Sequence, residues 1–156
     1  MTPADEIIEK IEASYAKIVR LYRSVPVNTL LEPTLSNGWS VKDLLGHLAM
    51  WEWRCAGLLE QAHHSDLPLK AEPDVDALNR EAYQERQELE WEEVEQDFRQ
   101  AHAVLLTNIR AMPAERLQTQ FVQDSIAGET WHHYEEHLPA LEAWHKQVAT
   151  QKPRRR

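Results

Sequence analysis

The sequence of 156 residues has little glycine and almost no cysteine. It contains four glycines and a single cysteine, Cys55. One cysteine excludes an internal disulfide framework, so we expect a protein of the reducing cytoplasm. The N-terminal residues contain no basic segment followed by an apolar segment, so no secretory signal is predicted.

Long hydrophobic runs and an excess of positive charge are also missing. No stretch approaches the roughly 18–20 apolar residues of a membrane span, which predicts no membrane partner. The chain has 17 Lys and Arg against 26 Asp and Glu, a formal net charge of −9. Because nucleic-acid-binding proteins usually present a basic face, this balance argues against a nucleic acid as partner.

Residues that favour helices are abundant. Ala, Leu, Glu, Gln and Arg are frequent, and alternating runs of β-branched residues are absent. Apolar residues instead recur at spacings of three and four, the pattern of an amphipathic helix. Four segments of this kind are predicted: residues 3–24, 40–62, 74–112 with an interruption near 88–91, and 130–148.

The remaining residues are expected to form connections. Proline and polar residues predict loops at residues 25–39 and 63–73. Residues 114–128 are predicted to form an irregular connection in which Gly128 is the turn residue. The whole pattern predicts an all-α four-helix bundle in a single domain of residues 1–150, followed by a basic tail of residues 151–156.

Several residues mark the ends and bends of these helices. Ser40 is a good N-cap, and Asp43 follows it at the spacing of a capping box. Thr130 is the candidate N-cap of the last helix. Pro139 lies inside that helix, where it removes the hydrogen bond to the carbonyl of Glu135 and predicts a kink.

Two of the eight histidines form a candidate pair of metal ligands. His133 and His137 are four residues apart, so their side chains leave the last helix about 40° apart around its axis. Their face continues as Ala140, Leu141 and Trp144, which makes it the core-facing side. Two imidazoles one turn apart suit two positions on one metal ion.

His47 supplies a third inward imidazole. It lies three residues after Leu44 and four before Trp51, within the apolar stripe of the second helix. A bundle can bring this stripe against the last helix, and three neutral imidazoles would then leave coordination positions for water or substrate. The alternative is that each histidine is an ordinary core residue, and periodicity alone leaves that alternative open.

The other histidines, and the cysteine, are given simpler roles. Cys55 is interpreted as a small buried hydrophobic residue, with a reactive thiol or a neighbour of the metal as the alternative. The remaining histidines are predicted to lie outside the site: His63 and His64 in a polar loop, His102 beside the apolar stripe of its helix, His132 on another face and His145 near a helix end.

Three stretches of the sequence together resemble a known family. They are GWSVKDLLGHLAMWE at residues 38–52, DALNREAY at residues 76–83, and TWHHYEEHL at residues 130–138, closed by Ala143 and Trp144. In order and spacing they resemble the DinB/YfiT-like metal-binding four-helix bundles, and especially the ClbS/DfsB branch.

The resemblance implies a metal centre and a chemistry. The family's metal triad corresponds to His47, His133 and His137, and the metal is commonly zinc or nickel. Some members resemble transferases that use low-molecular-weight thiols, whereas ClbS-type members act on a reactive natural product and need not keep the first histidine. This chain keeps all three, as is typical of the metal-binding branch, and a homodimer is a further expectation from the family.

These observations lead to one leading hypothesis and two alternatives. The leading hypothesis is a metal-dependent detoxification enzyme, a thiol transferase or a hydrolase, acting on a small-molecule substrate. The alternatives are a protective bundle that binds ligands without turnover, and a metal-free interaction protein. No catalytic residue is assigned. The candidate pocket residues are Trp39, Trp51, Asn79, Tyr83 and Trp144, with Glu136 either an acceptor for an imidazole or an exposed acid.

Overall fold

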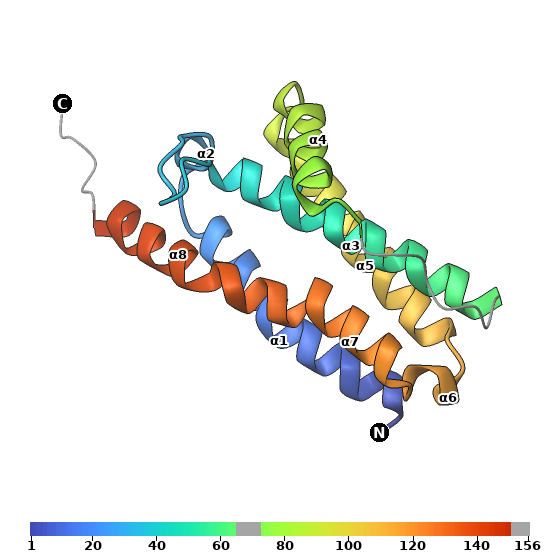
Figure 1. The fold of residues 1–156 in the computed structure, drawn as a ribbon. Coiled ribbons are helices and arrows are strands. Elements are labelled where there is room, and N and C mark those ends of the chain that lie inside the picture. The colour runs from blue at the N-terminus through green and yellow to red at the C-terminus, as the bar shows by residue number, and fades with distance from the viewer. Residues whose placement is uncertain (65–72, 151–156) are drawn as a thin grey trace, which may run out of the picture.

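Every regular element that the structure describes is a helix (Figure 1). The structure is a computed structural model, and the described residues are 1–64 and 73–150. The four longest helices, α1, α3, α5 and α8, form an all-α four-helix bundle, as predicted. The elements are α1 (Pro3–Arg23), α2 (Val27–Leu30), α3 (Val41–His64), α4 (Val75–Gln87), α5 (Trp91–Ala111), α6 (Ala114–Leu117), α7 (Gln120–Glu129) and α8 (Trp131–Thr150).

The long helices associate as two pairs. Helix α1 packs along α8, and α3 packs along α5, while α4 lies against α3 and α7 lies beside α8 (Figure 1). Helices α3 and α8 therefore belong to different pairs, and they face each other across the bundle. Side chains from all four long helices and from the connections fill the space between them, among them Ile11, Tyr22, Leu45, Leu48, Phe98, Ile109, Leu117 and Tyr134.

Local sequence signals place the starts of the helices. The predicted capping box of α3 is present: the Ser40 hydroxyl accepts from the Asp43 N–H at 3.0 Å, and the Asp43 carboxylate accepts from the Ser40 N–H at 2.9 Å. Thr2 and Asp5 form a second capping box at the start of α1. These reciprocal bonds satisfy backbone donors that the first helical turn leaves free.

A tight turn before α3 places the first aromatic residue of the site. The N–H of Gly38 bonds the carbonyl of Leu35 at 2.9 Å, and the N–H of Leu35 bonds the carbonyl of Trp39 at 3.0 Å. Gly38 has a φ of +86°, a conformation that a residue with a side chain rarely adopts. The turn therefore holds Trp39 directly in front of the helix that carries His47.

Two predicted connections contain helices, and these predictions were wrong. Residues 25–39 include the single-turn helix α2, which buries Leu30. Residues 114–128 were expected to be irregular but form α6 and α7, because Val122 and Ile126, four residues apart, both pack into the core. Gly128 accordingly lies in the last turn of α7 and not in a loop.

Other predicted boundaries also shift. Helix α3 continues to His64, so His63 lies in a helix and not in the predicted loop. Thr130 lies directly before α8, as predicted, and its carbonyl accepts from the Tyr134 N–H at 2.8 Å. Its hydroxyl donates back to the Ile126 carbonyl at the end of α7. Helix α8 continues through Pro139. The rest of the predicted second loop, residues 65–72, and the basic tail at 151–156 lie outside the described residues.

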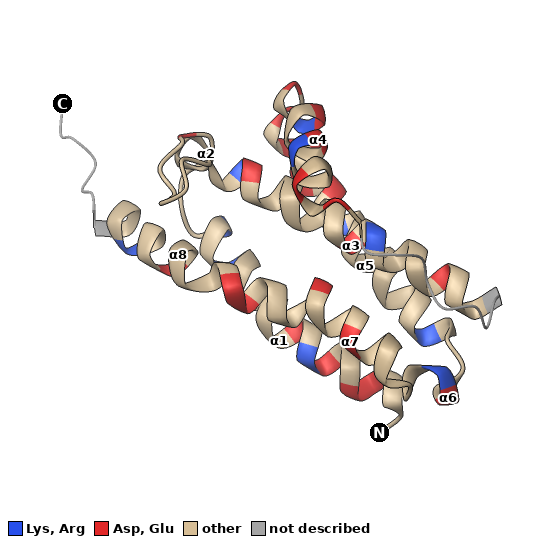
Figure 2. Cartoon of the chain, in the orientation of Figure 1, with Lys and Arg blue, Asp and Glu red and all other residues tan. Residues whose placement is uncertain are grey.

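Charged residues are spread over the bundle. In the view of Figure 2, the Lys and Arg residues that the structure describes are scattered among the helices and interspersed with Asp and Glu. Among the described helices, none is long and apolar enough to cross a membrane.

Candidate metal centre

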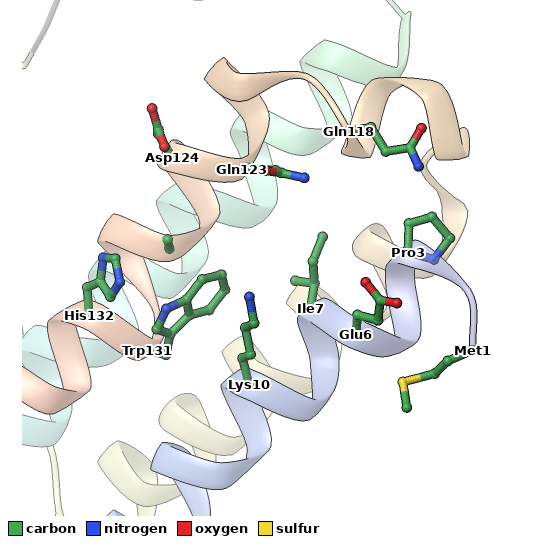
Figure 3. Close-up of a pocket in the computed structure, with 11 residues that line it drawn as sticks. Met1, Pro3, Glu6, Ile7, Lys10, Gln118, Gln123, Asp124, Trp131 and His132 are labelled. Carbon is green, nitrogen blue, oxygen red and sulfur yellow. The ribbon is translucent and has the colours of Figure 1, made fainter.

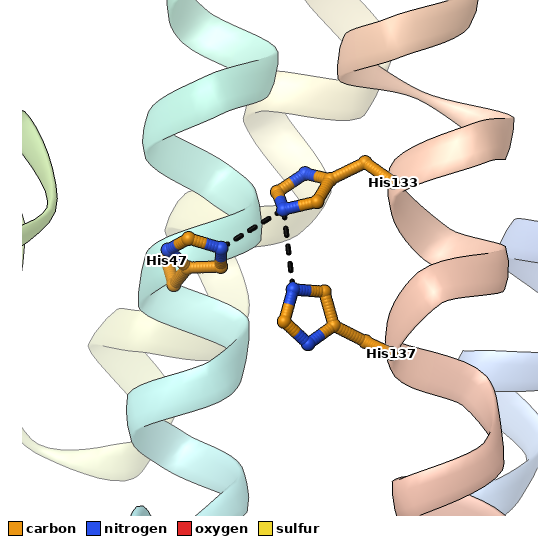
Figure 4. A group of neighbouring side chains, drawn as sticks. All are labelled: His47, His133 and His137. Atoms are coloured by element: carbon orange, nitrogen blue, oxygen red, sulfur yellow. Dashed lines mark hydrogen bonds between the residues drawn. The ribbon is translucent and has the colours of Figure 1, made fainter. Parts of the chain in front are cut away.

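Three imidazoles from two helices meet inside the bundle (Figure 4). His47 extends from α3, and His133 and His137 extend from successive turns of α8. The Nε2 atom of His133 lies 2.9 Å from Nε2 of His47 and 3.2 Å from Nε2 of His137. One nitrogen from each of the three side chains lies within 4.8 Å of the other two. The structure therefore brings together the residues that the sequence predicted as a triad.

The spacing of these nitrogens fits a divalent transition metal. A zinc–nitrogen bond is about 2.0–2.1 Å, so neighbouring nitrogens around a tetrahedral ion are about 3.3 Å apart. The observed contacts of 2.9 and 3.2 Å need only a slight opening to accept an ion. A neutral imidazole carries one ring proton, so three ring nitrogens aimed at one another present lone pairs that a shared cation would satisfy.

The surroundings keep these imidazoles uncharged, the form that binds metals. Burial, together with the nearby His137, lowers the pKa of His47 to about 4, although the Asn79 side chain opposes the shift. Burial, with His47 and His137 adding to it, lowers the pKa of His133 to about 3. Burial also lowers the pKa of His137, against the opposing charge of Glu136. All three are thus neutral at pH 7.

Beside the triad lies a pocket of about 420 Å³. Trp51 forms part of its wall and is held by a hydrogen bond from its indole N–H to the Asn79 side-chain oxygen at 2.8 Å. The Trp39 ring lies 5.2 Å from the ring of His47, centroid to centroid. Three of the five predicted pocket residues, Trp39, Trp51 and Asn79, therefore line the pocket with the triad.

The other two predicted pocket residues are placed elsewhere. Tyr83 stacks on Trp39 with 6.1 Å between ring centroids and is not part of the pocket wall. Trp144 is buried in the core, where its indole N–H donates to the Thr34 hydroxyl at 3.0 Å. Tyr83 thus contacts the pocket wall only through the ring of Trp39. Trp144 packs between α8 and the segment before α3.

Two carboxylates also line the pocket, and the sequence singled out only one of them. Glu136 is exposed and lines the pocket beside the triad. Glu129, at the end of α7, is largely buried, and one of its oxygens lies 3.7 Å from the Arg54 guanidinium. Burial raises the pKa of Glu129 to about 7, although Arg54 opposes the shift. Helical spacing gave no signal for Glu129, because it belongs to α7 whereas His133 and His137 belong to α8.

A larger cavity, of about 640 Å³, lies between α1, α7 and α8 (Figure 3). Trp131 forms part of its floor, and the Lys10 ammonium lies 5.5 Å from the Trp131 ring centroid. His132, the neighbour of the triad residue His133, points into this cavity. Within the described residues only the His47, His133 and His137 group has the spacing of metal ligands, so the smaller pocket is the candidate site.

A second polar cluster lies in the core, where the sequence predicted no polar group. His102 was placed beside the apolar stripe of its helix but is buried, with its ring stacked on Tyr15 at 3.5 Å between centroids. It bonds Glu12 through one nitrogen, and its Nδ1 lies 3.8 Å from the carboxylate of Glu52. Glu52 is fully buried and accepts a hydrogen bond from the Tyr134 hydroxyl. This cluster joins α1, α5, α3 and α8 next to the triad.

Cys55 is buried, and this supports its interpretation as a small hydrophobic residue. Burial raises its pKa well above the usual value, with Glu129 and Glu52 adding to the shift. We therefore predict that a thiol-specific chromogenic disulfide leaves Cys55 unmodified in the folded protein and reacts with one thiol per chain in urea. Rapid modification without denaturant would contradict this prediction.

The fold and the triad define the class of the protein: it is a DinB/YfiT-like helical bundle. Residues 11–144 match the mycothiol maleylpyruvate isomerase N-terminal domain family, and the chain belongs to this family. Members of the DinB-like group bind divalent metals, and the chain has a three-histidine group of the corresponding kind. Searches of curated proteins and of solved structures gave no match.

Proposed function

We propose that the protein is a metal-dependent enzyme that joins a low-molecular-weight thiol, or water, to a reactive small molecule. The observation that carries the proposal is the convergence of three neutral imidazole nitrogens beside an open pocket. Membership of a family named for a mycothiol-dependent isomerase supports the thiol as co-substrate. Zinc or nickel is the proposed metal, because borderline-soft ions favour imidazole and thiolate ligands.

The pocket explains why a bound metal would be needed. Its described lining contains no Ser, Thr, Cys or Lys side chain that could act as a nucleophile. We therefore assign the role of nucleophile to the thiol or water that enters the pocket. A divalent metal on the triad supplies Lewis acidity, which lowers the pKa of a thiol or of water.

The residues of the chain hold, orient and shield the reactants. His47, His133 and His137 would hold the ion and supply three of its ligands, and a thiol or water in the pocket would supply a further ligand. The ring of Trp51, fixed by its bond to Asn79, gives the pocket a rigid apolar wall. An apolar wall excludes water from the reacting groups and strengthens the electrostatic interactions inside the pocket.

Metal loading is expected to stabilise the fold. At a free zinc concentration about 100 times Kd, binding to the folded state contributes about 2.7 kcal/mol, which raises Tm by about 5–10 °C in a chain of this size. Thermal unfolding of tag-free protein, with elemental analysis for about one ion per chain, measures both quantities. Magnesium at the same concentration is the control, because it prefers oxygen ligands. Equal shifts with both metals would contradict a specific histidine site.

Binding without turnover is a second candidate function, and it is favoured by the lack of a Ser, Thr, Cys or Lys nucleophile in the described pocket wall. The two functions are separated by mixing metal-loaded protein with excess thiol and excess electrophile. An enzyme forms many equivalents of adduct per chain. A sequestering protein captures one equivalent and then stops.

The family is named for an enzyme that acts on maleylpyruvate, which is a dicarboxylate. In this chain two carboxylates, Glu129 and Glu136, line the pocket. Because like charges repel, this pocket favours an electrophile that is not a dicarboxylate.

A further inference from the structure

The charges that line the pocket are of one sign. Among the described residues of its wall, the carboxylates of Glu129 and Glu136 are present and no Lys or Arg is. Apart from the imidazoles of the triad, the other described lining residues are Asn, Trp, Val and Gly, which carry no charge. A substrate group that enters the pocket therefore meets negative side chains.

The nearest cationic side chain, Arg54, already forms an ion pair with Glu129. The Arg54 guanidinium lies 3.7 Å from Glu129, and its carbon lies 6.0 Å from the centroid of the Trp51 ring. Arg54 is not part of the pocket wall. A substrate carboxylate would therefore have to replace Glu129 as the partner of Arg54 and would leave a partly buried carboxylate without it.

The carboxylates of the pocket wall can bind a positive group of the substrate in addition to a metal on the triad. A divalent ion on three neutral imidazoles brings a charge of +2, and one thiolate offsets half of it. Glu129 already has Arg54 as a cationic partner. Glu136, on the exposed side of the pocket, is the carboxylate that can pair with a positive group of the substrate. The second oxygen of Glu129 is buried and has no hydrogen-bond partner among the described residues, so it is available as an acceptor.

We propose that this pocket selects thiols that carry an ammonium group close to the sulfur, and discriminates against thiols that carry a carboxylate there. The selection rests on the proposed function, since it concerns the co-substrate of the same site. A cationic aminothiol places its sulfur toward the triad and its ammonium group between Glu129 and Glu136. A carboxylate in that place is repelled by both side chains.

The experiment uses protein loaded with cobalt(II), because a thiolate that binds cobalt produces a charge-transfer absorption band. The probes are cysteamine, 2-mercaptoethanol and 3-mercaptopropionate, which carry an ammonium, a neutral and a carboxylate group. Each is titrated until the band saturates, and the affinity is corrected for the fraction of thiolate at that pH. We expect cysteamine to bind about tenfold more tightly than 3-mercaptopropionate, with 2-mercaptoethanol between them.

Variants test whether the two carboxylates cause the preference. Glu129→Gln and Glu136→Gln should each reduce the cysteamine preference, and the preference should also shrink as salt is raised. Glu135→Gln is the matched control: it removes the same charge from an exposed residue of α8 that does not line the pocket. It should keep the preference. The visible cobalt bands confirm that each variant is folded and loaded.

The outcomes separate this inference from the function on which it rests. Equal affinities for the three thiols, or tighter binding of 3-mercaptopropionate, would overturn the selectivity and leave the thiol function standing. A preference that survives both Gln substitutions would overturn the role of the two carboxylates. If none of the thiols produces the band, the thiol function itself fails, and the selectivity fails with it.

Discussion

Replacing His133 with alanine is expected to reduce zinc affinity by more than about a hundredfold. Residues that only support a metal ligand contribute 10–100-fold to affinity, so loss of a ligand should cost at least as much. His133 is also the central member of the triad, because its Nε2 atom lies within 3.2 Å of the other two. Competition with a chromophoric chelator, on protein without a histidine tag, measures the change.

The adjacent histidine provides the control for this experiment. His132 precedes His133 on the same helix, but it is exposed and points into the other cavity. His132→Ala removes the same chemical group and should leave zinc affinity unchanged. If the two variants bind zinc equally well, the triad is not the metal site and the proposed function loses its basis.

Periodicity predicted the elements that build the site. The apolar stripe around His47 and the four-residue spacing of His133 and His137 each define one face of a helix, and these faces meet in the structure. Ser40 and Asp43 fixed the start of α3 through local hydrogen bonds that the sequence shows directly. That a metal occupies the triad stays a prediction.

Residues whose role depends on distant partners were not predicted. His102 was predicted to lie beside the apolar stripe of α5, although its spacings, four residues after Phe98 and seven before Ile109, are those of the buried face. Glu52 has the same spacings, four residues after Leu48 and seven before Leu59, but it was not predicted to be a core residue. A carboxyl group in the core is tolerated only with partners, and those come from helices 50 and 82 residues further along the chain. Helix α7 was missed because it has only 10 residues and a glycine lies in its last turn.

The buried cluster around Glu52 is expected to make a large contribution to stability only while its charges are paired. Burial raises the pKa of Glu52, with His102 and Tyr134 opposing the shift. Burial disfavours the charge on His102, but Glu52 and Glu12 outweigh it, so the pKa of His102 is raised. His102→Leu leaves the Glu52 carboxylate without its cationic partner, which we expect to cost about 3 kcal/mol in the free energy of unfolding.

A second substitution tests whether the lost pairing is the cause. Glu52→Gln removes the charge and retains an oxygen for the Tyr134 hydroxyl. In that background His102→Leu should cost only about 1 kcal/mol, because no buried charge is left unpaired. Glu12→Gln removes the exposed partner of the same imidazole and should have a small effect. Urea unfolding of the metal-free proteins measures all of these differences, and a strictly additive cycle would contradict the coupling.

The pH dependence gives an independent check of the same coupling. A carboxyl group with a raised pKa in the folded state contributes full stability below its unfolded pKa, near 4.5, and loses it as pH rises through the folded pKa. Without His102 the pKa of Glu52 rises further, so this loss is larger in His102→Leu than in the original protein. The difference in the free energy of unfolding between the two proteins should therefore grow from pH 4.5 to pH 6.5, the usual pKa of histidine. The triad histidines contribute equally in both proteins, so their contribution cancels in the difference. A difference in the free energy of unfolding that is constant over this range would refute the pairing of Glu52 with His102.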